Sequence, residues 1–147
     1  MSTPSGPRPH LDSSLTVAQV MTREPKTMRR NDKLAIGDEL MRVGRFRHVV
    51  VVDDDGGVAG VLSQNDMMLN ALAWHLGQGR KLHDRMLETA LAKDLMRTDV
   101  VTVGPDVPIG EAARLMATRK IGCLPVVGDE GLVGIVTESD LLGLLGR

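Results

Sequence analysis

Residues 124–140 read LPVVGDEGLVGIVTESD, and this stretch decides the fold. It holds two short apolar runs on either side of an acidic, glycine-containing turn, which is the pattern of a β-hairpin. A closely similar stretch, VVVVDDDGGVAGVLSQND, stands at residues 49–66. The chain therefore contains the same predicted hairpin twice, and an internal repeat is the first hypothesis to examine.

The repeat extends beyond the hairpins on both sides. An offset of 75 residues pairs Met21 with Met96 and Leu40 with Leu115. After the hairpin turn, which is one residue longer in the first copy, the offset becomes 74. We assign a flexible tail to residues 1–14, repeat one to 17–68, a linker helix to 69–90, repeat two to 91–142 and a C-terminal helix end to 143–147.

Each copy also carries a strand and a helix ahead of its hairpin. In the second copy, the β-branched run 100–103 precedes Ile109, Ala112 and Met116, which share one face of an amphipathic helix. A helix between two strands implies a right-handed crossover. The prediction is an α/β (α+β) fold of two β-α-β-β-α repeats, packed sheet to sheet with pseudo-two-fold symmetry. The first copy has Gly37 where the second has Ala112, so we expect looser packing there.

The composition disfavours several classes of function. The 147 residues carry 18 basic and 19 acidic side chains, and Phe46 and Trp74 are the only aromatic residues. Proteins that bind single-stranded nucleic acid usually combine positive charge with aromatic stacking, so nucleic-acid binding is disfavoured. A single cysteine, Cys123, and the lack of a long apolar run favour a cytoplasmic protein without a membrane span. Neither a catalytic triad nor metal-ligand spacing is present, which predicts no enzyme activity and no metal site.

The end of each hairpin carries the strongest candidate chemistry. Residues 60–66 and 134–140 both read glycine, two apolar residues, a hydroxyl residue, two variable positions and aspartate. At a strand-to-helix junction, a hydroxyl and free N–H groups can bind phosphate, and a nearby carboxylate can hold ribose hydroxyls. The same spacing also fits a helix capping box, which needs no ligand. The preceding glycine, which a cap does not require, favours the ligand hypothesis.

Three strings together resemble the hallmarks of a tandem cystathionine β-synthase (CBS) domain pair, the Bateman module. They are Asp94-Leu95-Met96, IGCLPVV at residues 121–127 and GIVTESD at residues 134–140. The resemblance implies a regulatory module that binds AMP, ADP, ATP or S-adenosylmethionine in clefts between the two copies. These ligands would be effectors, since no obligatory cofactor is implied. The resemblance also implies homodimers. A stand-alone pair of CBS domains would have to regulate a separate protein partner, in trans.

The resemblance also implies roles for individual residues. Thr137 and Ser63 would contact phosphate, and Asp140 and Asp66 would hold the ribose hydroxyls. The segments that would read the base or line the site are Thr27, Met28, Arg47 and His48 in the first copy, and Thr102, Val103, Lys120, Gly122 and Cys123 in the second. The second copy matches the family pattern better, so its site is the stronger prediction.

A second hypothesis assigns the pair no ligand at all. The fold would then serve only as a dimerisation and protein-interaction scaffold, and each hydroxyl and aspartate would simply cap a helix. Leucines on both sides of the short closing helix, including Leu142 and Leu145, favour a homodimer under either hypothesis.

Overall fold

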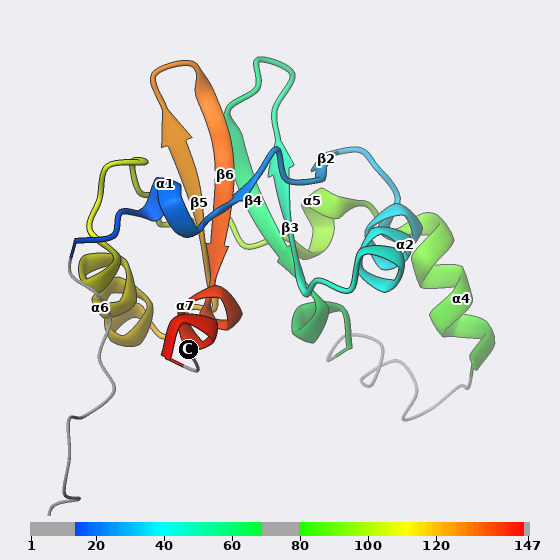
Figure 1. Cartoon of the computed structure of the whole chain (residues 1–147). Helices are drawn as coiled ribbons and strands as arrows, with labels where there is room; N and C mark the ends of the chain where they lie inside the picture. Colours follow the sequence, from blue (N-terminus) through cyan, green and yellow to red (C-terminus); the bar gives the residue numbers. More distant parts are fainter. Residues whose placement is uncertain (1–13, 69–79, 146–147) are drawn as a thin grey trace, which may run out of the picture. The chain divides into compact units, whose positions relative to one another are not determined.

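The computed structural model describes residues 14–68 and 80–145 (Figure 1). Most of the predicted tail and residues 69–79 of the predicted linker helix lie outside the described residues. Two three-stranded sheets with accompanying helices confirm the mixed α/β class. In chain order the elements are α1 (Val17–Val20), β1 (Thr22–Arg23), β2 (Thr27–Arg29), α2 (Leu34–Gly44), β3 (His48–Val52), β4 (Val58–Ser63), α4 (Arg80–Thr89), α5 (Ala92–Leu95), α6 (Ile109–Arg119), β5 (Cys123–Gly128), β6 (Gly131–Thr137) and α7 (Glu138–Leu145).

The described chain forms two compact units, which we name by their hairpins. The β3–β4 unit holds residues 24–68, 80–101 and 129–132. The β5–β6 unit holds residues 14–23, 102–128 and 133–145. This division differs from that of the sequence repeats, because the start of each repeat belongs to the unit that contains the other repeat's hairpin.

The β3–β4 unit contains the predicted strand–helix–strand–strand arrangement in full. Its sheet has the order β2-β3-β4, with β2 parallel to β3 and β3 antiparallel to β4. Met28 lies opposite Val51 in the parallel pair, and α2 makes the crossover between them. Figure 1 shows α2 beside α4.

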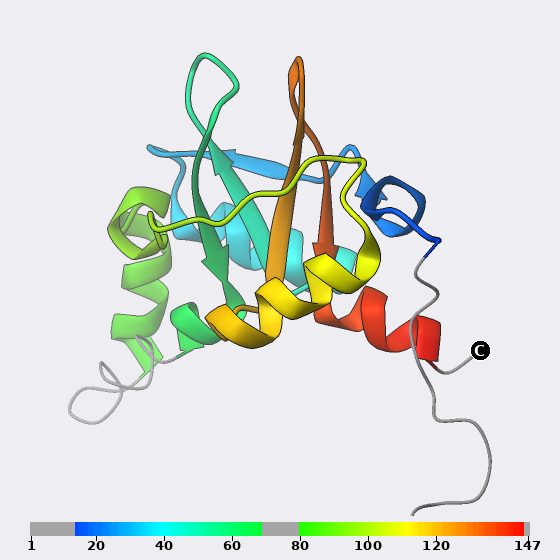
Figure 2. The same cartoon turned by 90° about the vertical axis from the view of Figure 1, so that its left-hand side faces the viewer.

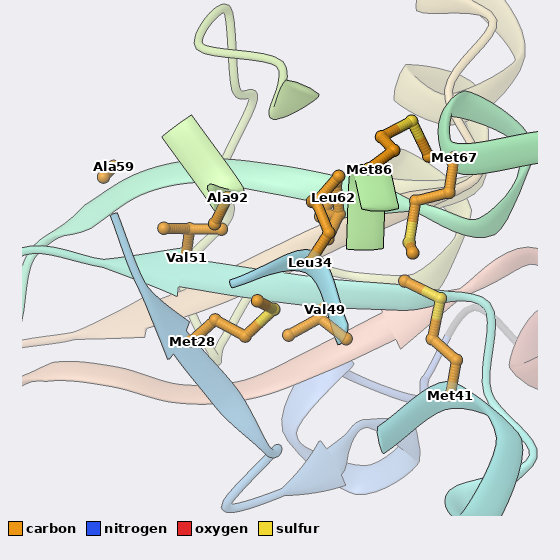
Figure 3. Packing of buried hydrophobic residues seen from close by; sticks show 10 residues of the cluster. All are labelled: Met28, Leu34, Met41, Val49, Val51, Ala59, Leu62, Met67, Met86 and Ala92. Atoms are coloured by element: carbon orange, nitrogen blue, oxygen red, sulfur yellow. The ribbon is translucent and has the colours of Figure 1, made fainter. Parts of the chain in front are cut away.

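Methionines fill much of the core of the β3–β4 unit. Figure 3 shows Met28, Met41, Met67 and Met86 among aliphatic side chains from the sheet and helices. Met28 and Met86 are almost fully buried, at 1% and 2% exposure. Unbranched thioether side chains adapt to irregular spaces, which suits a buried cluster of methionine and aliphatic side chains against which Phe46 packs.

The expectation of looser packing at Gly37 is wrong. This residue lies in α2, and a Cβ there would come within 2.9 Å of the Met28 sulfur and 3.0 Å of a Leu62 methyl group. The missing side chain lets these two core residues close against the helix. The glycine does not shorten the helix, because α2 and its counterpart α6 both have 11 residues.

The β5–β6 unit departs from the predicted pattern at residues 100–103. This run forms only one parallel bridge, between Val103 and Val126, instead of a strand. The N–H of Val103 donates to Pro125, and the N–H of Val127 donates to Val103. Pro125 has no N–H with which to extend the ladder toward Val101, and Pro105 follows closely on the other side. The two prolines therefore limit the pairing to one residue.

Both units use a short segment from the start of the other repeat to cover a hairpin edge. We call these segments the first lead-in (residues 16–23) and the second lead-in (residues 91–97). In the first lead-in, β1 pairs antiparallel with β6, and Thr22 lies opposite Ile135. In the second, Arg97 forms an antiparallel bridge with Val61 of β4. Each lead-in thus shields the exposed edge of a strand, as sheet edges require.

Figure 2 shows α6 and α7 at the end of the β5–β6 hairpin that lies away from its turn. Thr137, the last residue of β6, directly precedes Glu138, the first residue of α7. Among the described residues, every helix is too short or too polar to span a membrane.

Candidate functional site

The junction between β6 and α7 brings Thr137 and Asp140 into direct contact. The Asp140 carboxylate accepts a hydrogen bond from the Thr137 N–H at 2.9 Å. The Thr137 hydroxyl accepts one from the Asp140 N–H at 3.3 Å. This reciprocal pair of hydrogen bonds is a capping box, which is the arrangement that the spacing of Thr137 and Asp140 also fitted in the sequence.

The loop before β5 lies against the same junction. The N–H of Glu138, the first residue of α7, donates to the Gly122 carbonyl at 3.0 Å. Gly122 therefore lies beside Thr137. Lys120 ends α6 in the left-handed conformation, with φ at 56°, and is exposed. This arrangement gathers a hydroxyl, a carboxylate and a lysine-bearing loop around one helix start.

The β3–β4 unit repeats this geometry with different side chains. The Ser63 hydroxyl accepts a hydrogen bond from the Asp66 N–H at 3.0 Å. His48 lies opposite Ser63 in the antiparallel pair, and the N–H of Gln64 donates to the Arg47 carbonyl at 2.8 Å. Four of the predicted residues therefore come together at the end of the β3–β4 hairpin that lies away from its turn.

Arg97 joins this second group, although the sequence analysis did not select it. Its guanidinium binds both oxygens of the Asp66 carboxylate, with Nε–Oδ2 and Nη2–Oδ1 distances of 3.2 Å. The hydrogen bond and the charge of Asp66 raise the pKa of Arg97 above its usual value. The only sequence signal was positional, because Arg97 stands one repeat offset from the uncharged Thr22.

The predicted base-reading residues divide into exposed and buried positions. Thr27 and Thr102 are exposed, whereas Met28 and Val103 are buried at 1% and 7% exposure. The Met28 side chain belongs to the core (Figure 3). Any contact that Met28 makes with a ligand would therefore come from its backbone.

Cys123 has the same restriction at the start of β5. It is 7% exposed, and burial raises the pKa of its thiol from 9.0 to about 12. A thiol with such a pKa holds its proton at neutral pH and is a poor nucleophile. The described residues also contain no group of three or more His, Cys, Asp and Glu side chains that could hold a metal ion.

The glycines before the two junctions have a structural reason that the sequence analysis did not foresee. A Cβ on Gly134 would lie 2.8 Å from the Thr22 carbonyl oxygen, and one on Gly60 would lie 2.6 Å from the Arg97 carbonyl oxygen. Each glycine thus admits the backbone of a lead-in. The glycine therefore does not discriminate between ligand binding and simple helix capping.

Comparison with known proteins identifies relatives over most of the chain. A family model described as CBS domain matches residues 17–72 and again residues 92–147. A CBS domain-containing protein of Dictyostelium discoideum is 32% identical over 132 residues, which cover 88% of this chain and 90% of that protein. A homoserine O-acetyltransferase of Methanococcoides burtonii is 30% identical over 132 residues, covering 89% of this chain but 24% of the enzyme.

Solved structures share the fold at similar levels of identity. A putative acetoin utilization protein (AcuB) from Vibrio cholerae is 35% identical with a TM-score of 0.72, covering 88% of this chain and 89% of its own. The CBS domain pair of the protein MJ0100, in complex with 5′-methylthioadenosine and S-adenosyl-L-methionine, is 25% identical with a TM-score of 0.74, covering 90% and 96%. The protein CBSX2 in complex with AMP is 27% identical with a TM-score of 0.68, covering 87% and 93%.

Proposed function

The chain belongs to the CBS domain family, and we propose that it is a regulatory module that binds an adenosine ligand and is not itself an enzyme. Thr137 and Asp140 form the better-matched site, and Ser63 and Asp66 form the second. In each, the hydroxyl and the helix N–H groups would face phosphate, and the carboxylate would hold the ribose. AMP, ADP, ATP and S-adenosylmethionine are the candidate effectors, and none is an obligatory cofactor.

One observation carries this proposal. Similar structures hold AMP in one case, and 5′-methylthioadenosine with S-adenosyl-L-methionine in another. The shared chemistry of these ligands is an adenosine group with ribose hydroxyls. Asp140 and Asp66, each fixed at a strand-to-helix junction, are carboxylates suited to accept such hydroxyls.

Calorimetric titration of ligand-free protein with AMP, ADP, ATP and S-adenosylmethionine tests the proposal. We expect the wild type to bind AMP, and Asp140→Ala to lose about tenfold or more in affinity, because hydrogen bonds to a charged acceptor would be lost. Asp140→Asn keeps an oxygen that can accept from the Thr137 N–H, so it separates lost charge from lost capping. Asp129→Ala in the β5–β6 turn is the matched control and should bind AMP normally.

The scaffold hypothesis predicts a different outcome in the same experiment. Asp140→Ala would still destabilise the protein by about 1 kcal/mol, because the capping box is broken. No adenosine ligand would bind the wild type, and none would change its thermal stability. Heat of binding in the wild type that Asp140→Ala removes would exclude the scaffold hypothesis.

A regulatory module acts on another molecule, which we propose to be a protein partner that responds to the ligand-bound state. We also propose that the module is a homodimer and that it lies in the cytoplasm. A single cysteine suits a reducing compartment. Met68 and Leu142 are repeat counterparts, each in the helix after its hairpin, and they are 60% and 64% exposed. Two large apolar side chains at equivalent positions favour contact with a second copy. The neighbouring Met67, by contrast, is 6% exposed and belongs to the core.

Light scattering tests the homodimer. We expect Leu142→Glu to convert the dimer to a monomer, because a carboxylate would be desolvated in the interface. Its free energy of unfolding as a monomer should change by less than about 0.5 kcal/mol, as is usual at exposed positions. Val43→Glu, at a position 74% exposed on α2, is the control and should remain dimeric. A monomeric wild type would contradict the proposal.

A further inference from the structure

The backbone of Arg97 is held beside β4 by two hydrogen bonds. Its N–H donates to the Val61 carbonyl at 2.9 Å, and its own carbonyl accepts from the Val61 N–H at 3.0 Å. Gly60 admits this close approach, as a Cβ there would lie 2.6 Å from the Arg97 oxygen. Backbone pairing thus fixes the Arg97 main chain within side-chain reach of Asp66, whether or not the ion pair forms.

The ion pair occupies the groups that a ribose would use. The Arg97 guanidinium binds both Asp66 oxygens at 3.2 Å, and these are the acceptors for two adjacent ribose hydroxyls. The Asp66 side chain is 15% exposed, whereas that of Arg97 is 62% exposed. Arg97 therefore covers the carboxylate from the solvent side, and a ligand that needs Asp66 must displace it.

The described residues of the β5–β6 unit place no such cover over Asp140. Thr22 is the counterpart of Arg97 and pairs with Ile135 as Arg97 pairs with Val61. In the described part of the chain, no lysine or arginine lies within ion-pair distance of Asp140. The adjacent Arg23 donates to the Ala18 carbonyl instead. One residue of each lead-in thus distinguishes the two sites.

We propose that Arg97 is a latch that competes with the ligand's ribose for Asp66. The two sites of one chain are then unequal, and an adenosine ligand fills the Asp140 site first. The inference rests on the proposed function, because it assigns Asp66 to ribose. Since the ion pair is largely solvent-exposed on the arginine side, it weakens binding at the Asp66 site without abolishing it.

Titration with AMP in an Asp140→Ala background, in which the Asp140 site binds at least about tenfold more weakly, reports mainly on the Asp66 site. Adding Arg97→Thr, which installs the counterpart residue, should tighten AMP binding there by about fivefold. Adding Asp66→Asn as well should remove this gain. Arg29→Thr is the matched control, because it removes an equally exposed arginine that pairs with Asp54 at the turn of the β3–β4 hairpin. It should leave AMP affinity unchanged.

The outcomes separate the latch from the proposed function. Unchanged or weaker AMP binding in the Arg97→Thr variant would overturn the latch, and weaker binding would mark Arg97 as a ligand contact. The proposed function would stand in both cases, provided that the wild type binds AMP. If neither the wild type nor any variant binds AMP, ADP, ATP or S-adenosylmethionine, the proposed function and the latch both fail.

Discussion

Replacing Gly134 with alanine is expected to lower the free energy of unfolding by about 2–3 kcal/mol, because the new methyl group has no space. It would lie 2.8 Å from the Thr22 carbonyl oxygen and 2.5 Å from the Met21 sulfur. The methionine side chain can move, but the carbonyl belongs to β1, which is paired with β6. The first lead-in must therefore shift or detach, and Met21, which is 9% exposed, would lose part of its burial.

Urea unfolding measures this effect against a control of the same chemical change. Gly110→Ala lies in α6 of the same unit, where a Cβ would meet nothing within 4 Å. We expect this variant to be more stable than the wild type by about 0.5–1 kcal/mol, since alanine favours a helix. Gly60→Ala should resemble Gly134→Ala. Equal stability of Gly134→Ala and wild type would contradict the close approach of the lead-in.

Local pattern was sufficient to predict both hairpins and the helix that precedes each of them. The turn at residues 128–131 and the apolar runs beside it depend on neighbours in sequence, and β5 and β6 form where the pattern placed them. The 3.6-residue period of Ile109, Ala112 and Met116 likewise predicted α6, where all three are buried. Such signals are strong because they repeat along one element.

The exchange of lead-ins could not be predicted in the same way. β1 has two residues, and the bridge of Arg97 has one, so neither carries a period that a strand prediction can use. Their partners lie far along the chain. The only trace of these contacts in the sequence is the lack of a side chain at Gly60 and Gly134. We interpreted these glycines as support for a ligand, because their role depends on a non-local backbone approach.

The sequence predicted which hydroxyl and carboxylate residues form the candidate sites, but it did not predict the ion pair at one of them. The repeated hydroxyl and aspartate located both junctions, and the structure places each pair at the start of a helix. Arg97 was missed because its ion pair with Asp66 spans 31 residues and depends on the bridge to Val61. Sequence alone aligned Arg97 with Thr22 and offered no reason to link it with a carboxylate.

Raising the pH above about 9 is expected to destabilise the protein through Cys123. Burial raises the pKa of its thiol from 9.0 to about 12. Below about pH 9 the thiol is protonated in the folded and the unfolded chain alike, so it makes the free energy of unfolding no lower there. Above that pH the unfolded chain releases the proton and the folded chain keeps it. The free energy of unfolding should then fall by about 1.4 kcal/mol per pH unit until the folded thiol also ionises, or about 2–3 kcal/mol by pH 11.

Urea unfolding of the wild type and of Cys123→Ala across this pH range isolates the thiol. The chain has no tyrosine, so no phenol titrates in the same interval, and lysines contribute equally to both proteins. The alanine variant should be less stable near neutral pH because it loses buried volume, but the difference should shrink and then reverse as the pH rises. A difference that stays constant with pH would mean that the folded thiol ionises as readily as the unfolded one. Slow thiol alkylation in the native state, and fast alkylation in urea, should accompany the predicted result, because only the thiolate reacts.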